Sequence, residues 1–391
     1  MTTQTIIFLA SVLTVAFAYL GYPLLVWLLV QVWGKPLRKS APIPRAVSIV
    51  IACHNEAENI ARRIAELQEL LRPLSPESEI IIVSDGSTDG TERIAAATGA
   101  LNVRVIQQPR NMGKAMALNA GVLSARNPIV VFGDSRQAWA PDAIEHMLDN
   151  YGDLQVGAVS GDLVLTSNDG SLAGVGLYWK LEKWIRLSES RLHSSVQVSG
   201  AICSVRRELF VSLEPGMILD DMAWPQSVAM QGYRVIHEPL AQAFDHLPEK
   251  PRDEMRRKIR TLAGNLQLLV LRPAIILPWR NPVWFAVICH KLLRLVVPWA
   301  MLTALVASAV SDSPVLRVAL VAQLAGYTLG VGALFAKRIS RLPLASTISS
   351  LLVLNAAAFM AWFVFFSGRS GRSWSKVRYS QPATLPAGSS T

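Results

Sequence analysis

The segment "EIIIVSDGSTDGT", Glu79 to Thr91, shows the strand-and-turn pattern from which the fold class can be inferred. It begins with a continuous apolar run, and such runs are typical of parallel strands that are buried on both faces. An acid, Asp85, follows at once, and the residues after it favour turns. The segment therefore predicts a buried strand over Glu79–Ser84 with polar groups at its carboxyl end, although a plain turn would show the same composition.

The same organisation repeats on both sides of this segment. Further strands are predicted at Ala46–Ala52, Val103–Gln107 and Ile129–Phe132, and helices at Ala57–Leu71, Thr91–Ala97 and Lys114–Ala125. This alternation indicates an α/β domain with a doubly wound, Rossmann-like sheet. Ligands of such sheets bind at the carboxyl ends of the strands. The residues after each strand are therefore the candidates for a functional site.

Polar residues follow the other strands as well. Asn55 and Glu56 come after the first, in "CHNEAEN", and could equally cap the next helix. Lys114, in "GKAMALNAG", begins a helix whose backbone could receive a phosphate. The segment lacks the Gly spacing of a P-loop, and no G-x-G-x-x-G follows the first strand, which argues against a nicotinamide or flavin enzyme.

The segment "VVFGDSRQAW", Val130 to Trp139, places a single acid, Asp134, at the end of the fourth strand. A carboxylate there is a candidate ligand of a divalent cation such as Mg²⁺, which takes oxygen ligands. Arg136 stands two residues later, where a second carboxylate might be expected. This cation could contact a diphosphate or could be a solvated surface charge.

Two later segments carry charges in informative places. Asp220 and Asp221, in "MILDDMAW", precede a helix pattern that they could cap, and "YRVIHEP" is predicted as a strand after it. The segment Pro251–Leu269 is basic at one end and apolar at the other, which is typical of a helix that lies in a membrane interface.

The composition suits both a soluble core and membrane segments, because 51% of the 391 residues are apolar and the mean hydropathy is +0.32. The net charge is +10. Runs long enough to span a bilayer are Ile6–Trp33, Leu292–Val310, Val315–Ala336 and Leu344–Phe366. The basic residues that follow the first run predict a cytoplasmic middle domain, whereas the basic tail disagrees with this topology. One C-terminal run could therefore be re-entrant or interfacial. The positive charge gathers beside the spans, which indicates membrane lipids as partners and no nucleic acid.

These patterns divide the chain into five parts. They are an N-terminal anchor (1–40), the α/β domain (41–250), interfacial helices (251–291), C-terminal transmembrane helices (292–366) and a partly disordered tail (367–391). Cys53, Cys203 and Cys289 lie far apart and predict neither a disulfide framework nor a zinc site.

Together and in this order, the motifs "CHNE", "SDGSTDGT", "GKAMALNAG", "GDS" and "LDD" resemble those of the family-2 glycosyltransferases with the GT-A fold, which include relatives of cellulose, chitin and hyaluronan synthases. The resemblance runs from Ala46 to about Gln267. It implies an inverting glycosyltransferase of the inner (plasma) membrane with a cytoplasmic catalytic domain. The implied donor is a nucleotide sugar, a UDP-sugar, and the implied acceptor is a saccharide or lipid-linked acceptor in surface polysaccharide assembly.

The resemblance also implies roles on the donor side. Ala52, Asn55 and Glu56 would border the base and ribose of the nucleotide. Asp85 would bind the uracil or the ribose, and Lys114 would lie near the base or diphosphate.

Further roles follow from the family's later motifs. Asp134 matches the first acid of the D-x-D motif that binds Mg²⁺ or Mn²⁺, and the departure at Arg136 implies a weaker or more replaceable metal. Asp221 aligns with the last acid of the T-E-D motif and would be the general base, with Asp220 beside it.

The Q-x-x-R-W motif of the family falls on the start of the basic helix. Arg257 and Arg260 would donate hydrogen bonds to the diphosphate. Thr261 stands where the motif has Trp, so that a stacking surface for the acceptor is missing and short or single additions are expected.

Two alternatives remain open at this level. One transfers a single sugar to a lipid, such as a polyprenyl phosphate or a ceramide-like lipid. The other, from a different class, is a non-catalytic nucleotide-binding scaffold or transporter. The predicted spans contain few charges, which argues against an ion path through them.

Overall fold

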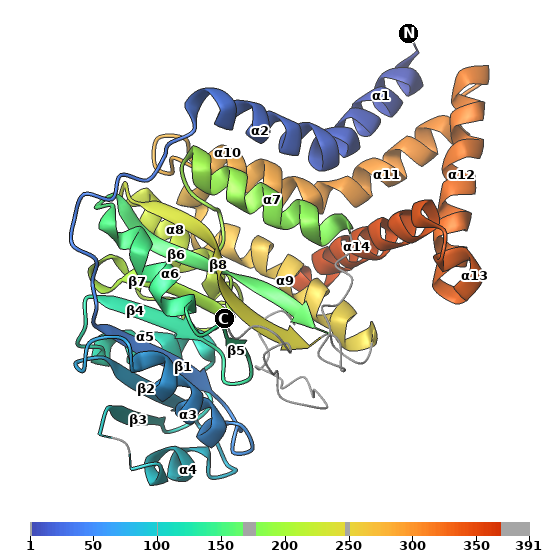
Figure 1. The fold of residues 1–391 in the computed structure, drawn as a ribbon. Helices are drawn as coiled ribbons and strands as arrows, with labels where there is room; N and C mark the ends of the chain where they lie inside the picture. The colour runs from blue at the N-terminus through green and yellow to red at the C-terminus, as the bar shows by residue number, and fades with distance from the viewer. Residues whose placement is uncertain (1, 100, 167–176, 247–250, 369–391) are drawn as a thin grey trace.

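The computed structural model describes residues 2–99, 101–166, 177–246 and 251–368 (Figure 1). Within these residues a sheet with helices on both faces lies beside a layer of long apolar helices. The predicted tail falls almost entirely on residues 369–391, which are outside the described residues.

The parallel half of the sheet follows the predicted strands. Its members are β1 (Val47–Cys53), β2 (Glu79–Asp85), β3 (Val103–Gln108) and β4 (Ile129–Gly133), in the spatial order β3-β2-β1-β4. All three pairings are parallel, and every residue of β1, β2 and β4 is buried. Burial on both faces explains the continuous apolar runs and confirms the predicted strands.

Helices cover both faces of this half, because successive side chains of a strand point to opposite sides. Ile49 and Ile51 of β1 pack with α3 (Ile60–Leu71), whereas Val50 packs with α5 (Lys114–Ser124). α4 (Thr91–Ala97) has its predicted bounds. α3 begins three residues later than predicted, because the chain first makes a turn; its N-cap is Asn59, so the capping alternative for Asn55 is wrong.

The second half of the sheet is mixed. It contains β5 (Ala138–Trp139), β6 (Val156–Thr166), β7 (Ile202–Arg206) and β8 (Arg234–His246), with β7 antiparallel to both β4 and β6. The helices of this half are α6 (Ala143–Asp149), α7 (Leu177–Leu192) and α8 (Asp220–Met230). The sequence predicted only β8 and the helix before it, because the strict alternation of strands and helices ends after β4.

Four helices are long and apolar enough to cross a membrane, by length and composition, within the described residues. They are Thr3–Trp33, Trp284–Ala309, Pro314–Phe335 (α12) and Pro343–Phe366 (α14). The first joins α1 (Thr3–Ala16) to α2 (Tyr22–Trp33), and the second joins α10 (Trp284–Ala286) to α11 (Leu293–Ala309), each through a π-helical turn. The short α13 (Lys337–Ser340) precedes α14.

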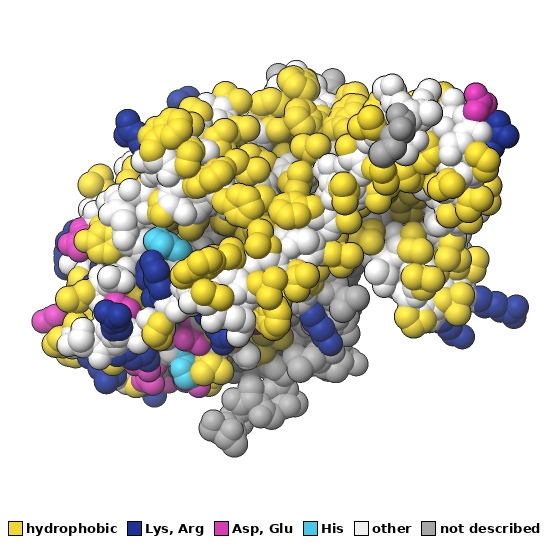
Figure 2. Space-filling model, turned by 90° about the horizontal axis from the view of Figure 1, so that it is seen from above, with side chains coloured by type: hydrophobic (Ala, Val, Ile, Leu, Met, Phe, Trp, Pro, Cys, Tyr) yellow, Lys and Arg dark blue, Asp and Glu magenta, His cyan; other side chains and the backbone are white. Residues whose placement is uncertain are grey.

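The predicted number of candidate spans is thus confirmed, but the second begins at Trp284 and not at Leu292. The added stretch contains His290 and Lys291, which are buried against the rest of the protein. Figure 2 shows hydrophobic side chains over much of the helical layer, with Lys and Arg mainly toward its margins. Exposed apolar side chains such as Val315 (76%) and Phe335 (85%) are those that a lipid environment would cover.

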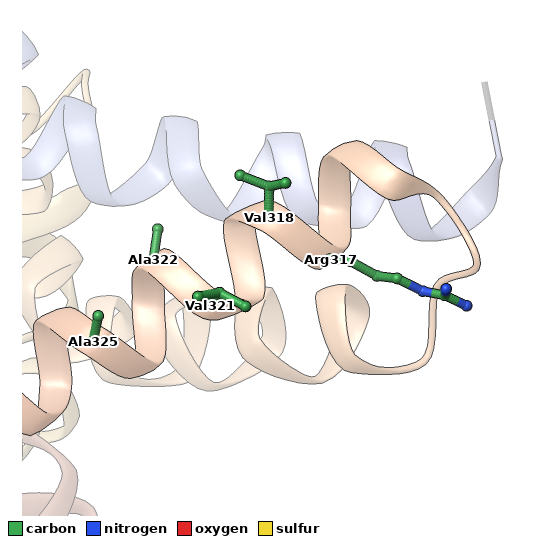
Figure 3. A pocket seen from close by; sticks show the side chains of 5 residues that line it. All are labelled: Arg317, Val318, Val321, Ala322 and Ala325. Carbon is green, nitrogen blue, oxygen red and sulfur yellow. The ribbon is translucent and has the colours of Figure 1, made fainter.

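A hollow of about 410 Å³ lies on the outer surface of α12 (Figure 3). It is lined by Arg317, Val318, Val321, Ala322 and Ala325. It contains no carboxylate, imidazole or thiol, and its position on a candidate span suits contact with lipid. The polar groups that could take part in chemistry lie instead at the strand ends.

α9 (Pro251–Leu271) brings the predicted basic helix to the sheet domain. A Cβ on Gly264 would lie 2.8 Å from Leu219 Cγ and 2.9 Å from Ile218 Cγ2. Only glycine therefore allows α9 to lie this close to the segment that leads into α8. The other side of α9 contacts α14, so this helix connects the sheet domain to the apolar layer.

Candidate functional site

Side chains from three separate elements meet at the carboxyl ends of the strands. The Nζ atom of Lys114, at the start of α5, lies 2.8 Å from Asp134 Oδ1, just after β4. The same Nζ lies 3.8 Å from Asp220 Oδ2, at the start of α8. Asp221 is the next residue of α8. The structure thus brings together four of the residues that the sequence predicted for a site.

A small cavity of about 10 Å³ opens beside this cluster, which is room for about one water molecule. Its lining is Lys114, Leu118, Phe132, Gly133, Gly200, Cys203, Asp220, Asp221 and Trp224. A Cβ on Gly200 would lie 3.8 Å from Lys114 Nζ, so the loop before β7 forms one wall. The apolar part of the lining lowers the local polarity and strengthens the charge interactions inside.

The surroundings of Asp221 raise its pKa and fix the orientation of its carboxylate. Burial, with repulsion from Asp220, raises the pKa of Asp221 to about 6. The Gln197 amide donates to its Oδ2 at 2.7 Å. A carboxyl group with a pKa close to neutrality can accept a proton efficiently at physiological pH. Asp221 therefore has a pKa that suits a general base, and that role stays a prediction.

Asp220 lies beside Asp221 but has different neighbours. Burial raises its pKa, whereas Lys114 and the more distant Arg260 act in the opposite direction. Neither acid is the N-cap of α8: that residue is Leu219, and no side chain caps the helix. The capping alternative for this pair is therefore wrong, although both acids still lie favourably in the first turn of the helix.

Asp134 stays ionised. Burial opposes its ionisation, but Lys114 and then Arg136 outweigh burial and hold the pKa of Asp134 below its ordinary value. The same pairing with Asp134 and Asp220 overcomes the effect of burial on Lys114 and raises the pKa of the lysine. The cluster therefore holds permanent charges of both signs.

Arg136 is neither a solvated surface charge nor a free cation. Its Nε and Nη2 atoms donate to Asp245 Oδ2 at 3.1 and 3.0 Å, and Nη2 lies 4.0 Å from Asp134 Oδ2. Gln137 donates to the same Asp245 oxygen at 2.9 Å. Asp245, at the end of β8, thus supplies a second acid beside Asp134 that is distant in sequence.

The donor atoms permit a divalent cation only with help from a ligand. Among the residues that the structure describes, no group of three or more His, Cys, Asp or Glu side chains could hold a metal ion. Asp134 offers one carboxylate, and Lys114 already lies against its Oδ1. Mg²⁺ is commonly bound by one or two carboxylates together with substrate phosphates and water. Asp134 therefore fits as a single protein ligand of a cation that shares the oxygens of a diphosphate.

Asp85 organises the loop that leads to Lys114. Its carboxylate is buried and accepts hydrogen bonds from the backbone N–H groups of Met112 (2.6 Å) and Gly113 (2.8 Å). Gly113 has φ of +92°, a conformation that favours glycine, directly before the helix that carries Lys114. A contact between Asp85 and a nucleotide stays a prediction.

The loops after β1 and β2 are joined by hydrogen bonds. Asn55, with φ of +56°, accepts from the Thr88 N–H at 2.8 Å through its Oδ1. Glu56 accepts from the Asn59 side chain at 2.8 Å, and Ala52 is buried at the end of β1. These residues form one rim at the strand ends, where the nucleotide contacts predicted for them remain untested.

The two predicted arginines of α9 differ. Arg260 lies within electrostatic range of Asp220 and acts to lower its pKa. Arg257 instead pairs with Glu254 on its own helix at 2.8 Å. The structure therefore brings Arg260, and not Arg257, to the carboxylate cluster.

Sequence reasoning missed Gln197 and Asp245 as site residues. Neither lies in a recognisable motif, and each acts through a partner from a distant part of the chain. Only the three-dimensional pairing reveals them.

Comparison with known proteins agrees with this geometry. Residues 48–212 match the family model described as glycosyl transferase family 2. The poly-beta-1,6-N-acetyl-D-glucosamine synthase of Staphylococcus aureus (strain COL) is 26% identical over 231 residues, which cover 57% of this chain and 55% of that protein. The synthase of the same name from Staphylococcus epidermidis is 25% identical over 231 residues. The chain thus spans about half the length of the curated relatives it matches.

One solved structure matches nearly the whole chain. The mannosyltransferase PcManGT from Pyrobaculum calidifontis, in complex with GDP-Man and Mn²⁺, superposes with a TM-score of 0.67 and 23% identity, covering 92% of this chain and 99% of that one. This likeness is one of fold, and it confirms the predicted GT-A fold of the sheet domain.

Proposed function

We propose, from the premise that the sheet domain of this chain is a family-2 glycosyltransferase domain, that the protein transfers a sugar from a nucleotide sugar to an acceptor at the membrane. The observation that carries the proposal is the cluster of Lys114, Asp134, Asp220 and Asp221 at the strand ends. The catalytic unit is the domain of residues 41–250, and the helices on either side hold it at the bilayer.

Asp221 acts as the general base. Its carboxylate takes the proton of an acceptor hydroxyl while that oxygen attacks the anomeric carbon of the donor. The bond from this carbon to the diphosphate oxygen breaks, and the nucleoside diphosphate leaves with its electron pair. Attack from the face opposite the leaving group inverts the anomeric centre. The pKa of about 6 supports this role, since most Asp221 is ionised at neutral pH.

The donor is held on the other side of the cluster. Ala52, Asn55, Glu56 and Asp85 border the nucleotide, and Lys114 lies near its base or diphosphate. Positive charge close to a departing diphosphate stabilises the charge that develops there.

Further groups complete the diphosphate site. Arg260, with Arg257 as a more distant partner, donates to the phosphate oxygens. A divalent cation, Mg²⁺ or Mn²⁺, held by Asp134 and the donor's diphosphate would neutralise part of this charge. The Mn²⁺ in the PcManGT complex supports use of such a cation.

The acceptor is a saccharide or a lipid-linked acceptor in surface polysaccharide assembly, and the donor is a UDP-sugar. The relatives that synthesise poly-beta-1,6-N-acetyl-D-glucosamine support an N-acetylhexosamine product. The protein is a multi-pass component of the inner (plasma) membrane with its catalytic domain in the cytoplasm. The four candidate spans and the basic residues after the first span support this arrangement.

The test uses the full chain, purified in detergent, with UDP-N-acetylglucosamine, UDP-glucose and GDP-mannose as donors. Release of nucleoside diphosphate and the mass of the product are followed with and without saccharide acceptors. We expect release with one of these donors and loss of release in the Asp134→Ala variant. Folded protein that binds a nucleotide but releases no diphosphate from any donor would favour the scaffold alternative.

A further inference from the structure

α7 lies between the apolar helices and the sheet (Figure 1). On one side, Ile185 packs with Tyr22 and Cys289 of the candidate spans. On the other side, Lys183 Nζ donates to Asp162 Oδ2 of β6 at 2.6 Å. This helix therefore connects the candidate spans with the sheet.

Arg186, one turn after Glu182, has a guanidinium with unused donors. Its side chain is only 15% exposed, and its Nε is buried without a hydrogen-bond partner. The oxygen nearest to Nε in its ion pair, Glu182 Oε1, is 3.6 Å away, too far for a good hydrogen bond. No hydrogen bond joins this guanidinium to any described residue. Buried donors of this kind indicate a missing acceptor atom.

The carboxylate of Glu182 is already occupied by other cations. His290 Nε2 lies 3.0 Å and Lys291 Nζ 3.2 Å from Oε1, and Arg294 Nη1 donates to Oε2 at 2.7 Å. Glu189 is the second acid of this cluster and contacts His290 Nδ1 at 2.7 Å.

The two carboxylates of this cluster are thus contacted at short distance by His290, Lys291 and Arg294. Arg186 approaches only Glu182, at 3.6 Å. The nearer cations therefore leave Arg186 without a close acceptor in this cluster.

Arg186 also acts electrostatically on the carboxylates at the strand ends. It lies within electrostatic range of Asp221 and of Asp162, and acts to lower the pKa of both. One turn before Lys183 on the same helix, the indole Nε1 of Trp179 is buried without a partner, and Lys183 Nζ lies 6.0 Å from its ring. Trp179, Lys183 and Arg186 follow one another at helical spacing, so their donors belong to one stripe of α7.

We infer that this stripe binds a phosphate group of the acceptor, with Arg186 as its main ligand. A planar guanidinium with free donors matches phosphate oxygens in a bidentate way. The acceptor is then a saccharide joined through phosphate to a lipid: its hydroxyl lies at Asp221, its phosphate at Arg186 and its lipid along the candidate spans that α7 contacts. This inference rests on the proposed function and names the acceptor class of the same site.

The test measures binding by the full chain in a neutral polyoxyethylene detergent, without a donor. The probes are dodecyl phosphate, inorganic phosphate and the uncharged dodecyl glucoside, each followed by titration calorimetry. We expect dodecyl phosphate to bind, and Arg186→Gln to weaken this binding by about 10- to 100-fold, the usual effect of losing charged hydrogen bonds. Binding of dodecyl glucoside should not change.

Arg191→Gln is the matched control, since Arg191 is an exposed arginine at the end of the same helix. It should leave the binding of all three probes unchanged. Arg186→Lys keeps one positive charge and provides a readout if the Gln variant does not fold; it should weaken binding less than Gln. Thermal unfolding of each variant checks the fold.

A folded Arg186→Gln variant that binds dodecyl phosphate within two-fold of the parent would overturn the inference. Inorganic phosphate that binds as tightly as dodecyl phosphate would overturn the lipid-linked acceptor in favour of a soluble phosphorylated one. Because these titrations need no donor, they are independent of turnover. Conversely, diphosphate release with an uncharged saccharide would keep the proposed function even if Arg186 plays no part.

Discussion

Replacing Asp221 by Asn tests the base most directly. Asn keeps the size of the side chain and an oxygen that can accept from Gln197, which donates to Asp221 Oδ2 at 2.7 Å. It cannot take a proton. We expect sugar transfer to fall by about 10²- to 10⁴-fold, the usual contribution of a positioned base, or about 3–5 kcal/mol in the activation free energy. Nucleotide binding should barely change, because the proposed base acts on the acceptor hydroxyl and not on the diphosphate.

The same substitution should lower activity but raise the stability of the folded protein at pH 8. Burial and the neighbouring Asp220 raise the pKa of Asp221 from 3.8 to about 6, so the folded state favours the protonated form. The contribution of the Asp221 carboxyl to the free energy of unfolding is therefore fully present below about pH 4 and is lost as the pH rises through about 6. At pH 8 the folded protein must keep a buried Asp221 ionised, which is unfavourable. Asp221→Asn removes this unfavourable charge and should raise the free energy of unfolding at pH 8 by up to about 3 kcal/mol. The gain is smaller if solvent screens the carboxylate.

The assay combines steady-state transfer with thermal unfolding between pH 5 and pH 8. The parent should lose activity below a pKa of about 6, and the Asn variant should lack this limb. Asp220→Asn is the control and should lose less activity. A transfer rate for Asp221→Asn within a few-fold of the parent, in a folded protein, would refute the reasoning and move the search for a base to Asp220 or Asp162.

Four further predictions concern other parts of the site. Asp134→Ala should abolish donor turnover, and EDTA should inhibit until Mg²⁺ or Mn²⁺ is restored; full activity in EDTA would contradict a metal. Asp85→Ala should raise the KM for the donor more than it lowers kcat, because two backbone N–H groups before Lys114 lose their acceptor. Gly264→Leu should lower kcat and destabilise the protein by about 1–3 kcal/mol, because its Cβ would lie 2.8 Å from Leu219 Cγ, whereas Gly326→Leu, with no atom within 4 Å, should do neither. Products of the purified protein should be short, as mass spectrometry can show; long chains would contradict the interpretation of Thr261.

The parallel half of the sheet was predictable because its physical cause is local. Strands buried on both faces need continuous apolar runs, and each such run ends where the chain must turn. The mixed half follows a different rule. Residues of β7 and β6 are paired across the sheet with partners far away in the chain, such as Phe132 with Cys203. No periodicity in a short segment records such a pairing.

The start of the second candidate span was also misplaced because it depends on contacts between residues that are distant in the chain. His290 and Lys291 are polar residues that lie directly before Leu292, where the sequence placed the start of this span, and Arg294 lies just inside it. They are accommodated because Glu182 and Glu189 of α7 lie against them. Charges that neutralise one another in three dimensions are still counted as separate polar residues in a sequence window.

Asp220 and Asp221, at the start of α8, are identical side chains with different neighbours, and this difference suits them to different roles. Asp220 faces Lys114 Nζ at 3.8 Å and Arg260 beyond it, and both cations oppose the effect of burial on its pKa. Asp221 faces the neutral Gln197 and has Asp220 as its nearest charge, so its pKa rises to about 6. A pair of carboxyl groups whose surroundings separate their pKa values can divide the work of a reaction. Asp220 is then placed to order the cations of the proposed diphosphate site, whereas burial and the neighbouring Asp220 give Asp221 the raised pKa of the proposed base.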